Sequence, residues 1–307
     1  INNGYIKANN ISETHDSLYN SIIYNEGSFY NGDDGSGTID INLSGGSDNR
    51  GIYNYYGKFS NGSYDGSAPG TITTTMKDGS GNMGIYNYYG KFYNGSYDGS
   101  APGTIDISFN GGTGNWGIYN YYGKFYNGSY DDSGTAPGTI DISLNGGSGN
   151  RGIYNSDAEI FNGSHDGSAA GTIDINLSGG SGNWGIYNYS YFYNGSYNGS
   201  ATGTITTTMK GGSGNMGICN YDYFYNGSYD GSGTIDISLN GGTGNWGIYN
   251  DDGGDFYNGS YTGSATGTIT TTMKGGSGNR GIYNDDDGDF YNGSYNGSGA
   301  GKIDISL

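Results

Sequence analysis

Valine is absent from this 307-residue chain and leucine occurs only six times. Isoleucine and phenylalanine, with 29 and 10 copies, must therefore supply almost all of an apolar core. Proline occurs three times, whereas 66 residues are glycine, a density that disfavours helices. So few strong core formers, together with a net charge of −18, are typical of disordered chains. The average composition thus argues against folding, and only the regular placement of the apolar residues indicates an ordered protein.

Basic residues and cysteine are also scarce. The chain has 11 Lys and Arg against 29 Asp and Glu, which excludes the basic patch that nucleic-acid binding requires. The single cysteine, Cys219, excludes an internal disulfide and a cysteine metal set. No apolar run approaches the roughly 20 residues that span a bilayer, and no signal peptide is visible. His15, His165 and the three glutamates stand outside any repeated setting, so we predict that the protein is not an enzyme.

A four-residue motif, Gly-Ile-Tyr-Asn, returns along the chain at intervals of 30 to 35 residues. Its copies begin at Gly51, Gly84, Gly117, Gly152, Gly185, Gly247 and Gly281, with a Gly-Ile-Cys-Asn copy at Gly217. A fixed period of this length is typical of stacked arrays in which each unit buries its apolar face on its neighbours. We predict a tandem-repeat solenoid over residues 23–307, preceded by a degenerate or partial first coil over residues 1–22. The chain stops at Leu307 within an Ile-Asp-Ile-Ser-Leu strand pattern and has no polar cap there, so we expect a segment of a longer array or filament.

One repeat, residues 104–138, contains three short strand patterns. Residues 104–109 alternate apolar and polar side chains at period two, which is typical of a half-buried strand. Residues 110–115 are turn formers, and residues 117–120 and 124–127 form two further strand patterns. The sequence therefore predicts an all-β protein, a parallel β-helix or β-solenoid of about nine coils of about 33 residues. Two smaller coils per repeat remain an alternative.

The alternation also predicts which side chains face inward. The predicted core positions of this repeat are Ile105, Ile107, Phe109, Ile118 and Phe125. The predicted outward positions are Asp106, Ser108, Tyr119 and Tyr126. Asn120 has the inward parity, where stacked Asn side chains can form a hydrogen-bonded ladder from coil to coil. The residue before each Gly-Ile-Tyr-Asn motif is Arg, Met or Trp, which predicts an exposed corner.

The tripeptide Asn-Gly-Ser occurs in every full repeat, with extra copies at Asn198 and Asn296. Asn-x-Ser is the acceptor pattern for N-glycosylation, so the array predicts a column of covalent glycans along one edge. The alternative is purely structural, because Asn-Gly is also a common tight-turn pair. The candidate acceptors are Asn61, Asn94, Asn127, Asn162, Asn194, Asn226, Asn258 and Asn292.

Two further patterns point to ligands. Asp285, Asp287 and Asp289 lie in a glycine-containing loop and could supply oxygen ligands for calcium, although a solvated acidic loop is the alternative. We predict no other metal and no cofactor. The 34 tyrosines, many at outward positions, suit glycans, extracellular matrix or another fibre, or they simply cover the strands.

Gly-Thr-Ile-Asp-Ile followed by Gly-Gly-Ser-Gly-Asn-Trp-Gly-Ile-Tyr-Asn resembles the β-helical passenger regions of bacterial autotransporters and related surface adhesins. The likeness covers residues 20–307 and implies a rod-like protein outside the cell or at its surface. We therefore expect a non-catalytic, glycosylated shaft of a surface fibre that stacks head to tail with further copies. One alternative is an adhesin module whose Tyr and Asp rows bind glycans or matrix. A third is a polysaccharide-degrading enzyme with a groove near residues 156–165.

Overall fold

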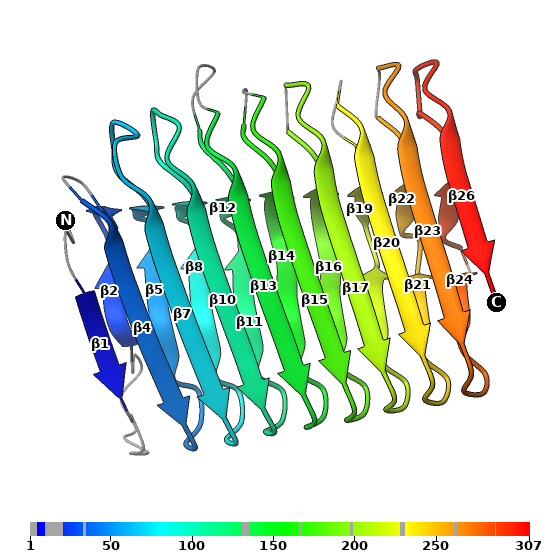
Figure 1. Ribbon diagram of the computed structural model, residues 1–307, viewed down its shortest axis with the longest axis horizontal. Helices are drawn as coiled ribbons and strands as arrows, with labels where there is room; N and C mark the ends of the chain where they lie inside the picture. Colours follow the sequence, from blue (N-terminus) through cyan, green and yellow to red (C-terminus); the bar gives the residue numbers. More distant parts are fainter. Residues whose placement is uncertain are drawn as a thin grey trace.

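The computed structural model describes residues 5–9, 21–32, 35–130, 135–165, 168–196, 199–227, 231–260, 263–285 and 287–307. All regular elements in these residues are β-strands, and each coil stacks its strands in parallel on those of the next coil. Figure 1 shows the long strands of successive coils side by side across the whole molecule. The predicted fold class, an all-β parallel solenoid, is confirmed.

The long alternating segments form a first sheet of ten strands, one from each successive coil. Its strands are β1 (Tyr5–Asn9), β4 (Gly37–Ser44), β7 (Gly70–Lys77), β10 (Gly103–Asn110), β13 (Gly138–Asn145), β15 (Gly171–Ser178), β17 (Gly203–Lys210), β20 (Gly233–Asn240), β23 (Gly267–Lys274) and β26 (Gly301–Ser306).

The second sheet has two arms that meet at a bend. The first arm carries the Gly-Ile-Tyr-Asn motif and comprises β2 (Ser21–Asn25), β5 (Arg50–Tyr55), β8 (Met83–Tyr88), β11 (Trp116–Tyr121), β18 (Met216–Asn220), β21 (Trp246–Asn250) and β24 (Arg280–Asn284). The second arm comprises β3 (Ser28–Tyr30), β6 (Lys58–Ser60), β9 (Lys91–Tyr93), β12 (Lys124–Tyr126), β19 (Tyr223–Tyr225), β22 (Asp255–Tyr257) and β25 (Asp289–Tyr291). Two longer strands, β14 (Arg151–Phe161) and β16 (Trp184–Tyr193), run through both arms.

The strand register shows one coil per repeat. Ile105 of β10 pairs with Ile140 of β13, and Ile118 of β11 pairs with Ile153 of β14, one full repeat later. The stacked rings of Phe59 and Phe92 are 4.7 Å apart, which is a single strand spacing. This register excludes two coils per repeat. With β14 and β16, the first arm contains nine strands among the described residues, close to the predicted repeat count.

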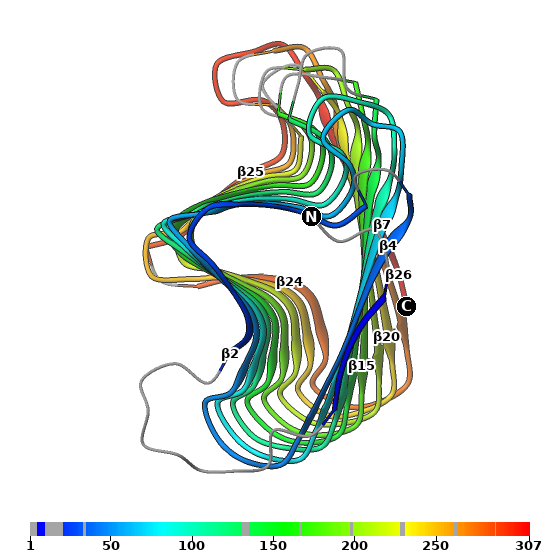
Figure 2. The same ribbon diagram turned by 90° about the vertical axis from the view of Figure 1, so that its left-hand side faces the viewer.

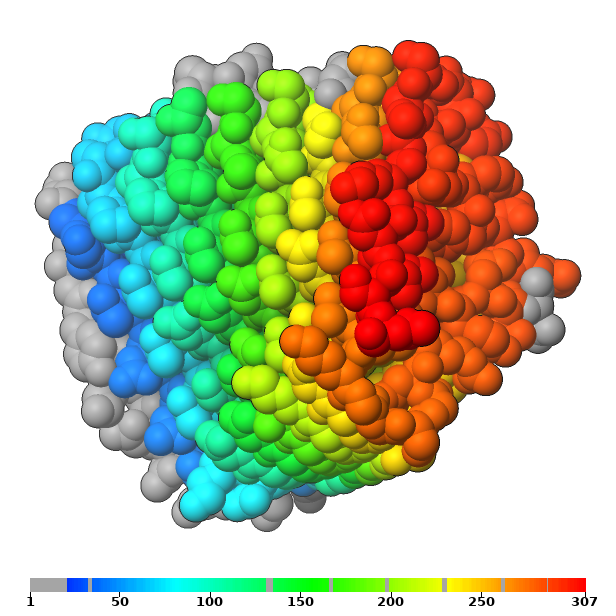
Figure 3. Space-filling model, turned by 45° about the vertical axis from the view of Figure 1, so that its right-hand side comes forward, coloured from blue at the N-terminus to red at the C-terminus, as the bar shows by residue number. Residues whose placement is uncertain are grey.

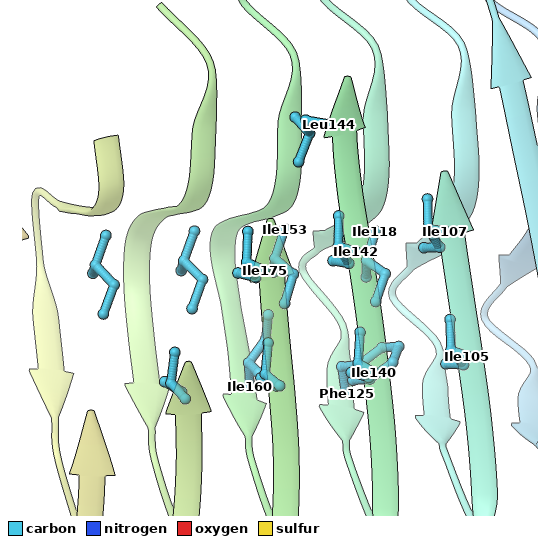
Figure 4. Packing of buried hydrophobic residues seen from close by; sticks show 14 of the residues in the cluster. Ile105, Ile107, Ile118, Phe125, Ile140, Ile142, Leu144, Ile153, Ile160 and Ile175 are labelled. Atoms are coloured by element: carbon cyan, nitrogen blue, oxygen red, sulfur yellow. The ribbon is translucent and has the colours of Figure 1, made fainter. Parts of the chain in front are cut away.

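The core lies between the first sheet and the two arms. Viewed along the axis, the first sheet forms one wall and the arms form the other, with the bend between them projecting away from the core (Figure 2). Isoleucines of both walls point toward one another (Figure 4). Ile105, Ile107, Phe109, Ile118 and Phe125 are all at most 1 % exposed, as predicted. Each coil supplies few apolar residues, and in-register stacking joins them into one continuous core.

Two predictions about exposure are wrong. Tyr126 was expected to point outward, but it is only 1 % exposed. Its ring stacks on Tyr93, and Tyr130 of the following loop packs against both rings, so a second aromatic cluster covers this face of the strand. Most residues before Gly-Ile-Tyr-Asn are not at an exposed corner either, although Arg280 in the last coil is exposed. Met83 is buried and Trp116 is half-buried, because both pack on the neighbouring tyrosines.

The first coil is described in part. Strand β1 pairs in register with β4 and so takes the place of a first-sheet strand, while residues 10–20 lie outside the described residues. Within the described part of the chain, there is no helix with the length and apolarity that crossing a membrane requires.

Candidate functional site

Asparagine side chains form ladders through the interior of the array. The Nδ2 of Asn87 donates to Oδ1 of Asn120 at 2.8 Å, and the Nδ2 of Asn120 donates to Oδ1 of Asn155 at 3.0 Å. The same nitrogen also donates to the carbonyls of Gly123 and Glu159 across the bend. Asn120 is fully buried, so the predicted ladder is confirmed. It pins the bend between the two arms in every coil.

The Asn-Gly-Ser asparagines form a second buried ladder. The Nδ2 of Asn127 donates to Oδ1 of Asn162 at 2.8 Å and to the Thr172 carbonyl at 2.9 Å, so both of its N–H groups are used. A Cβ at Gly138 would collide with Oδ1 of Asn127, so the ladder also requires glycine at the start of the long strand. The members with no exposed surface are Asn61, Asn94, Asn127, Asn162, Asn194, Asn226 and Asn258.

A sugar on Nδ2 of these seven residues is incompatible with the stacked coil, because the amide is buried and both of its donors are engaged. Asn292, in the last coil, is exposed and accepts a hydrogen bond from Asn258. The signal for this ladder was present in the sequence. If Phe125 points inward, Asn127 shares its parity.

The described residues of the acidic loop near the C-terminus are not placed as a set of metal ligands. In the ranges that the structure covers, no three His, Cys, Asp or Glu side chains are placed to hold one ion. Asp289 instead accepts a hydrogen bond from the Tyr291 hydroxyl at 2.8 Å. Asp285 and Asp287 are therefore not gathered with Asp289 into a ligand set, and Asp286 lies outside the described residues.

The outer face of the first sheet is polar and regular. Figure 3 shows the coils as parallel bands along the molecule. Asp106 and Ser108 point out of the sheet as predicted, and Asp106, Asp141 and Asp174 are in-register neighbours on three consecutive strands. Partial burial, and then the charges of the two flanking aspartates, raise the pKa of Asp141. Repulsion between these aspartates is locally unfavourable. On the strands that flank the column a threonine takes the aspartate position and adds no charge.

Tyrosines dominate the outer face of the two arms, where they stack in rows along the axis. The rings of Tyr53 and Tyr86 are 4.9 Å apart and 7° from parallel, and those of Tyr56 and Tyr89 are 4.9 Å apart and 3° from parallel. Each ring face within a row is therefore covered by the next ring. Only ring edges and hydroxyls contact solvent. Burial raises the pKa of Tyr86 and Tyr119, and raises that of Tyr187 to about 12.

The ionisable side chains of residues 156–165 make separate contacts. Glu159 pairs with Lys124 at 2.7 Å, whereas exposed Asp157 accepts a hydrogen bond from the Ser156 hydroxyl at 3.2 Å. His165 packs against the rings of Tyr126 and Tyr130 instead. Each of these groups is engaged by a different partner.

No protein-family model, curated protein or solved structure matches this chain significantly.

Proposed function

We propose that this chain is a non-catalytic structural solenoid that forms the shaft of a fibre or filament. The observation that carries the proposal is the parallel stacking of nearly identical coils, which is in register throughout the first sheet and shifts only between Ser156 and Glu159 in the second sheet of the described residues. Backbone ladders, asparagine ladders and aromatic rows all run in the same direction, along the axis. A stack held by bonds in this direction resists bending and separation of its coils.

The strength of each coil-to-coil junction comes from many bonds that act together. One junction aligns eight residue pairs in the first sheet, from Gly103 with Gly138 to Asn110 with Asn145. The two arms and the buried asparagine amides add further bonds across the same plane. Each bond contributes only about 1 kcal/mol, but separation of two coils must break all of them.

The C-terminal face of the array suits extension. Strands β24, β25 and β26 each pair on one side only in the described structure, and Ile305 in β26 is 53 % exposed. Unpaired strand edges template further strands, so another coil, from the same chain or from another copy, would continue every ladder. An extracellular or cell-surface location for this shaft rests on the resemblance of its repeats to autotransporter passenger regions.

The aromatic rows support the shaft better than they support an adhesin that binds glycans along its whole length. Sugar recognition by tyrosine uses the ring face, and the rows have most of their faces covered by the next ring. Stacked rings instead add contacts between coils.

Electron cryo-microscopy of the purified chain at increasing concentration tests the proposal. We expect end-to-end filaments with the coil spacing preserved across each junction. Ile305→Pro removes a donor from the open edge and should abolish them. Thr266→Pro is the matched control, because the equivalent loop position is Pro69 in another coil, and it should leave filaments intact. Single particles at all concentrations, or filaments that Ile305→Pro leaves unchanged, would contradict end-to-end growth.

A further inference from the structure

The tyrosine rows are interrupted where a small residue stands in register between two tyrosines. Three such places occur in the described coils. Ser60 lies between Tyr30 and Tyr93, Ser156 between Tyr121 and Tyr189, and Cys219 between Tyr187 and Tyr249. Each leaves out one ring from an otherwise stacked row.

Two of these gaps are filled by a neighbouring side chain. At Cys219, the ring of Tyr221 lies 5.4 Å from Tyr187 and 6.5 Å from Tyr249, and the cysteine is fully buried. At Ser60, which is also fully buried, Nζ of Lys58 lies 5.7 Å from the ring of Tyr30, one of the two flanking tyrosines, and close to the rings of Tyr64 and Tyr97 in the following loops. The fold therefore tends to close such gaps.

The gap at Ser156 stays open. Tyr121 and Tyr189 make no ring contact with each other, although they flank Ser156 in register. A surface cavity of about 320 Å³ opens there, within the size range of small-molecule sites. It is lined by Arg151, Tyr154, Ser156, Asp157, Tyr187 and Tyr189. Of the two tyrosines that flank Ser156 in register, Tyr189 lines the cavity and Tyr121 does not, so a ring-shaped group can pack against the Tyr189 side of the gap.

The polar groups of this cavity include a donor and an acceptor. The guanidinium of Arg151 lines the cavity, lies 4.8 Å from the Tyr187 ring centroid and 4.6 Å from the Trp184 ring, and forms no ion pair with a described carboxylate. The carboxylate of Asp157 is exposed and receives only the Ser156 hydroxyl. Aromatic walls with a nearby carboxylate and guanidinium suit a sugar, whose C–H face packs on a ring and whose hydroxyls both donate and accept.

We propose that the Ser156 gap binds one hexopyranose unit of a neutral polysaccharide, inserted where serine leaves out a ring of the tyrosine row. A neutral sugar fits better than an acidic one, because Asp157 lines the cavity and the chain carries a net charge of −18. This site is separate from the proposed end-to-end junctions. It would attach the shaft laterally to a polysaccharide.

Isothermal titration calorimetry on the full chain, with cellotetraose, maltotetraose and mannotetraose as probes, tests this site. We expect at least one of them to bind with one site per chain. Ser156→Tyr restores the missing ring and should weaken that binding at least tenfold. Ser143→Tyr makes the same change on the outer face of the first sheet, away from the cavity, and should leave binding unchanged.

A second variant tests the site by gain of binding. The coil of Arg50, Tyr53 and Tyr86 repeats the cavity walls, so Tyr55→Ser together with Tyr56→Asp should create a second gap of the same kind. The stoichiometry should rise from one to two. Absence of binding by all three probes, unchanged binding by Ser156→Tyr, or tighter binding of tetragalacturonate would overturn the proposal. Filament formation by Ser156→Tyr is a separate readout, so failure of the sugar site leaves the shaft proposal standing.

Discussion

At the scale of single residues, each buried asparagine depends on the asparagines of the two adjacent coils. Asn120 accepts one hydrogen bond from Asn87 and donates one to Asn155. Asn120→Ala therefore leaves a buried donor on one side and a buried acceptor on the other. Unsatisfied buried groups cost about 1–3 kcal/mol each, so we expect a loss of about 2–6 kcal/mol in the free energy of unfolding, measured by denaturant titration.

The control for that substitution is Asn145→Ala. Asn145 is exposed at the end of its strand, and its amide makes only a 3.5 Å contact with Asn110. Its loss should change the free energy of unfolding by less than about 0.5 kcal/mol. If both variants lose the same stability, the ladder has no special role.

In the aspartate column, by contrast, we expect a substitution to stabilise the protein. Asp141 is flanked in register by Asp106 and Asp174, and its pKa is raised, first by burial and then by these neighbours. Asp141→Asn should stabilise the protein at neutral pH by about 0.5 kcal/mol, since it removes like-charge repulsion. The gain should shrink as the pH falls through the raised pKa, where Asp141 itself takes up a proton.

The matched control is Asp236→Asn, because the in-register neighbours of Asp236 are Thr206 and Thr270. This variant relieves no repulsion between neighbouring aspartates and should show no comparable gain. Thermal unfolding of both variants across the acid range would separate the two cases. Equal stabilisation of both would contradict the repulsion argument.

At the scale of elements, the tyrosine rows make the array sensitive to alkali. Burial raises the pKa of Tyr86, Tyr119 and Tyr187 above the ordinary value of about 10. Above that pH the unfolded chain loses these protons while the folded chain keeps them, so the folded state binds more protons and stability falls as pH rises. Below it, both states are protonated and these groups give no pH dependence.

Two spectra recorded together test this behaviour. Near-ultraviolet absorbance reports tyrosinate formation, and far-ultraviolet circular dichroism reports the strands. We expect the buried tyrosines to ionise only as the strands are lost. Complete ionisation near pH 10 with the strand signal intact would show that the rows are open to solvent.

The elements themselves could be predicted because the apolar residues recur with a strict period. Alternation identified Ile105 and Ile107 as core, and the same parity placed Asn120 inside. It failed at Tyr126 because parity gives the face of a strand and does not show that a later loop folds over that face. Alternation also did not decide whether Asn127 is a turn residue or a glycan acceptor. A short motif does not show which hydrogen bonds its side chain makes with the next coil.

At the scale of the whole molecule, the coils should behave as interchangeable units. Removal of residues 84–116, one complete repeat, joins Met83 to Gly117 and keeps every strand in register. We expect this variant to fold with unchanged circular dichroism per residue, because each coil contacts only its neighbours. Removal of residues 84–99, about half a coil, shifts all later strands and should abolish cooperative unfolding. Equal tolerance of both deletions would contradict a stacked array.

The candidate binding site could be located from the sequence only in part. Residues 156–160 were visible as a departure from the repeat. That this departure opens a gap, whereas Cys219 and Ser60 do not, depends on whether a neighbouring side chain reaches the vacant place. Such filling is decided by packing in three dimensions, and a single repeat unit does not contain that information.

The central claim is that one repeat makes one coil of a rigid shaft, and its axial length tests this most directly. Duplication of residues 51–151 adds three repeats, and electron cryo-microscopy of the longer chain gives the change in length. The account predicts growth by about 14 Å along the axis, one strand spacing per repeat, with straight particles. Growth by about twice that amount, or flexible particles with no fixed increment, would contradict it.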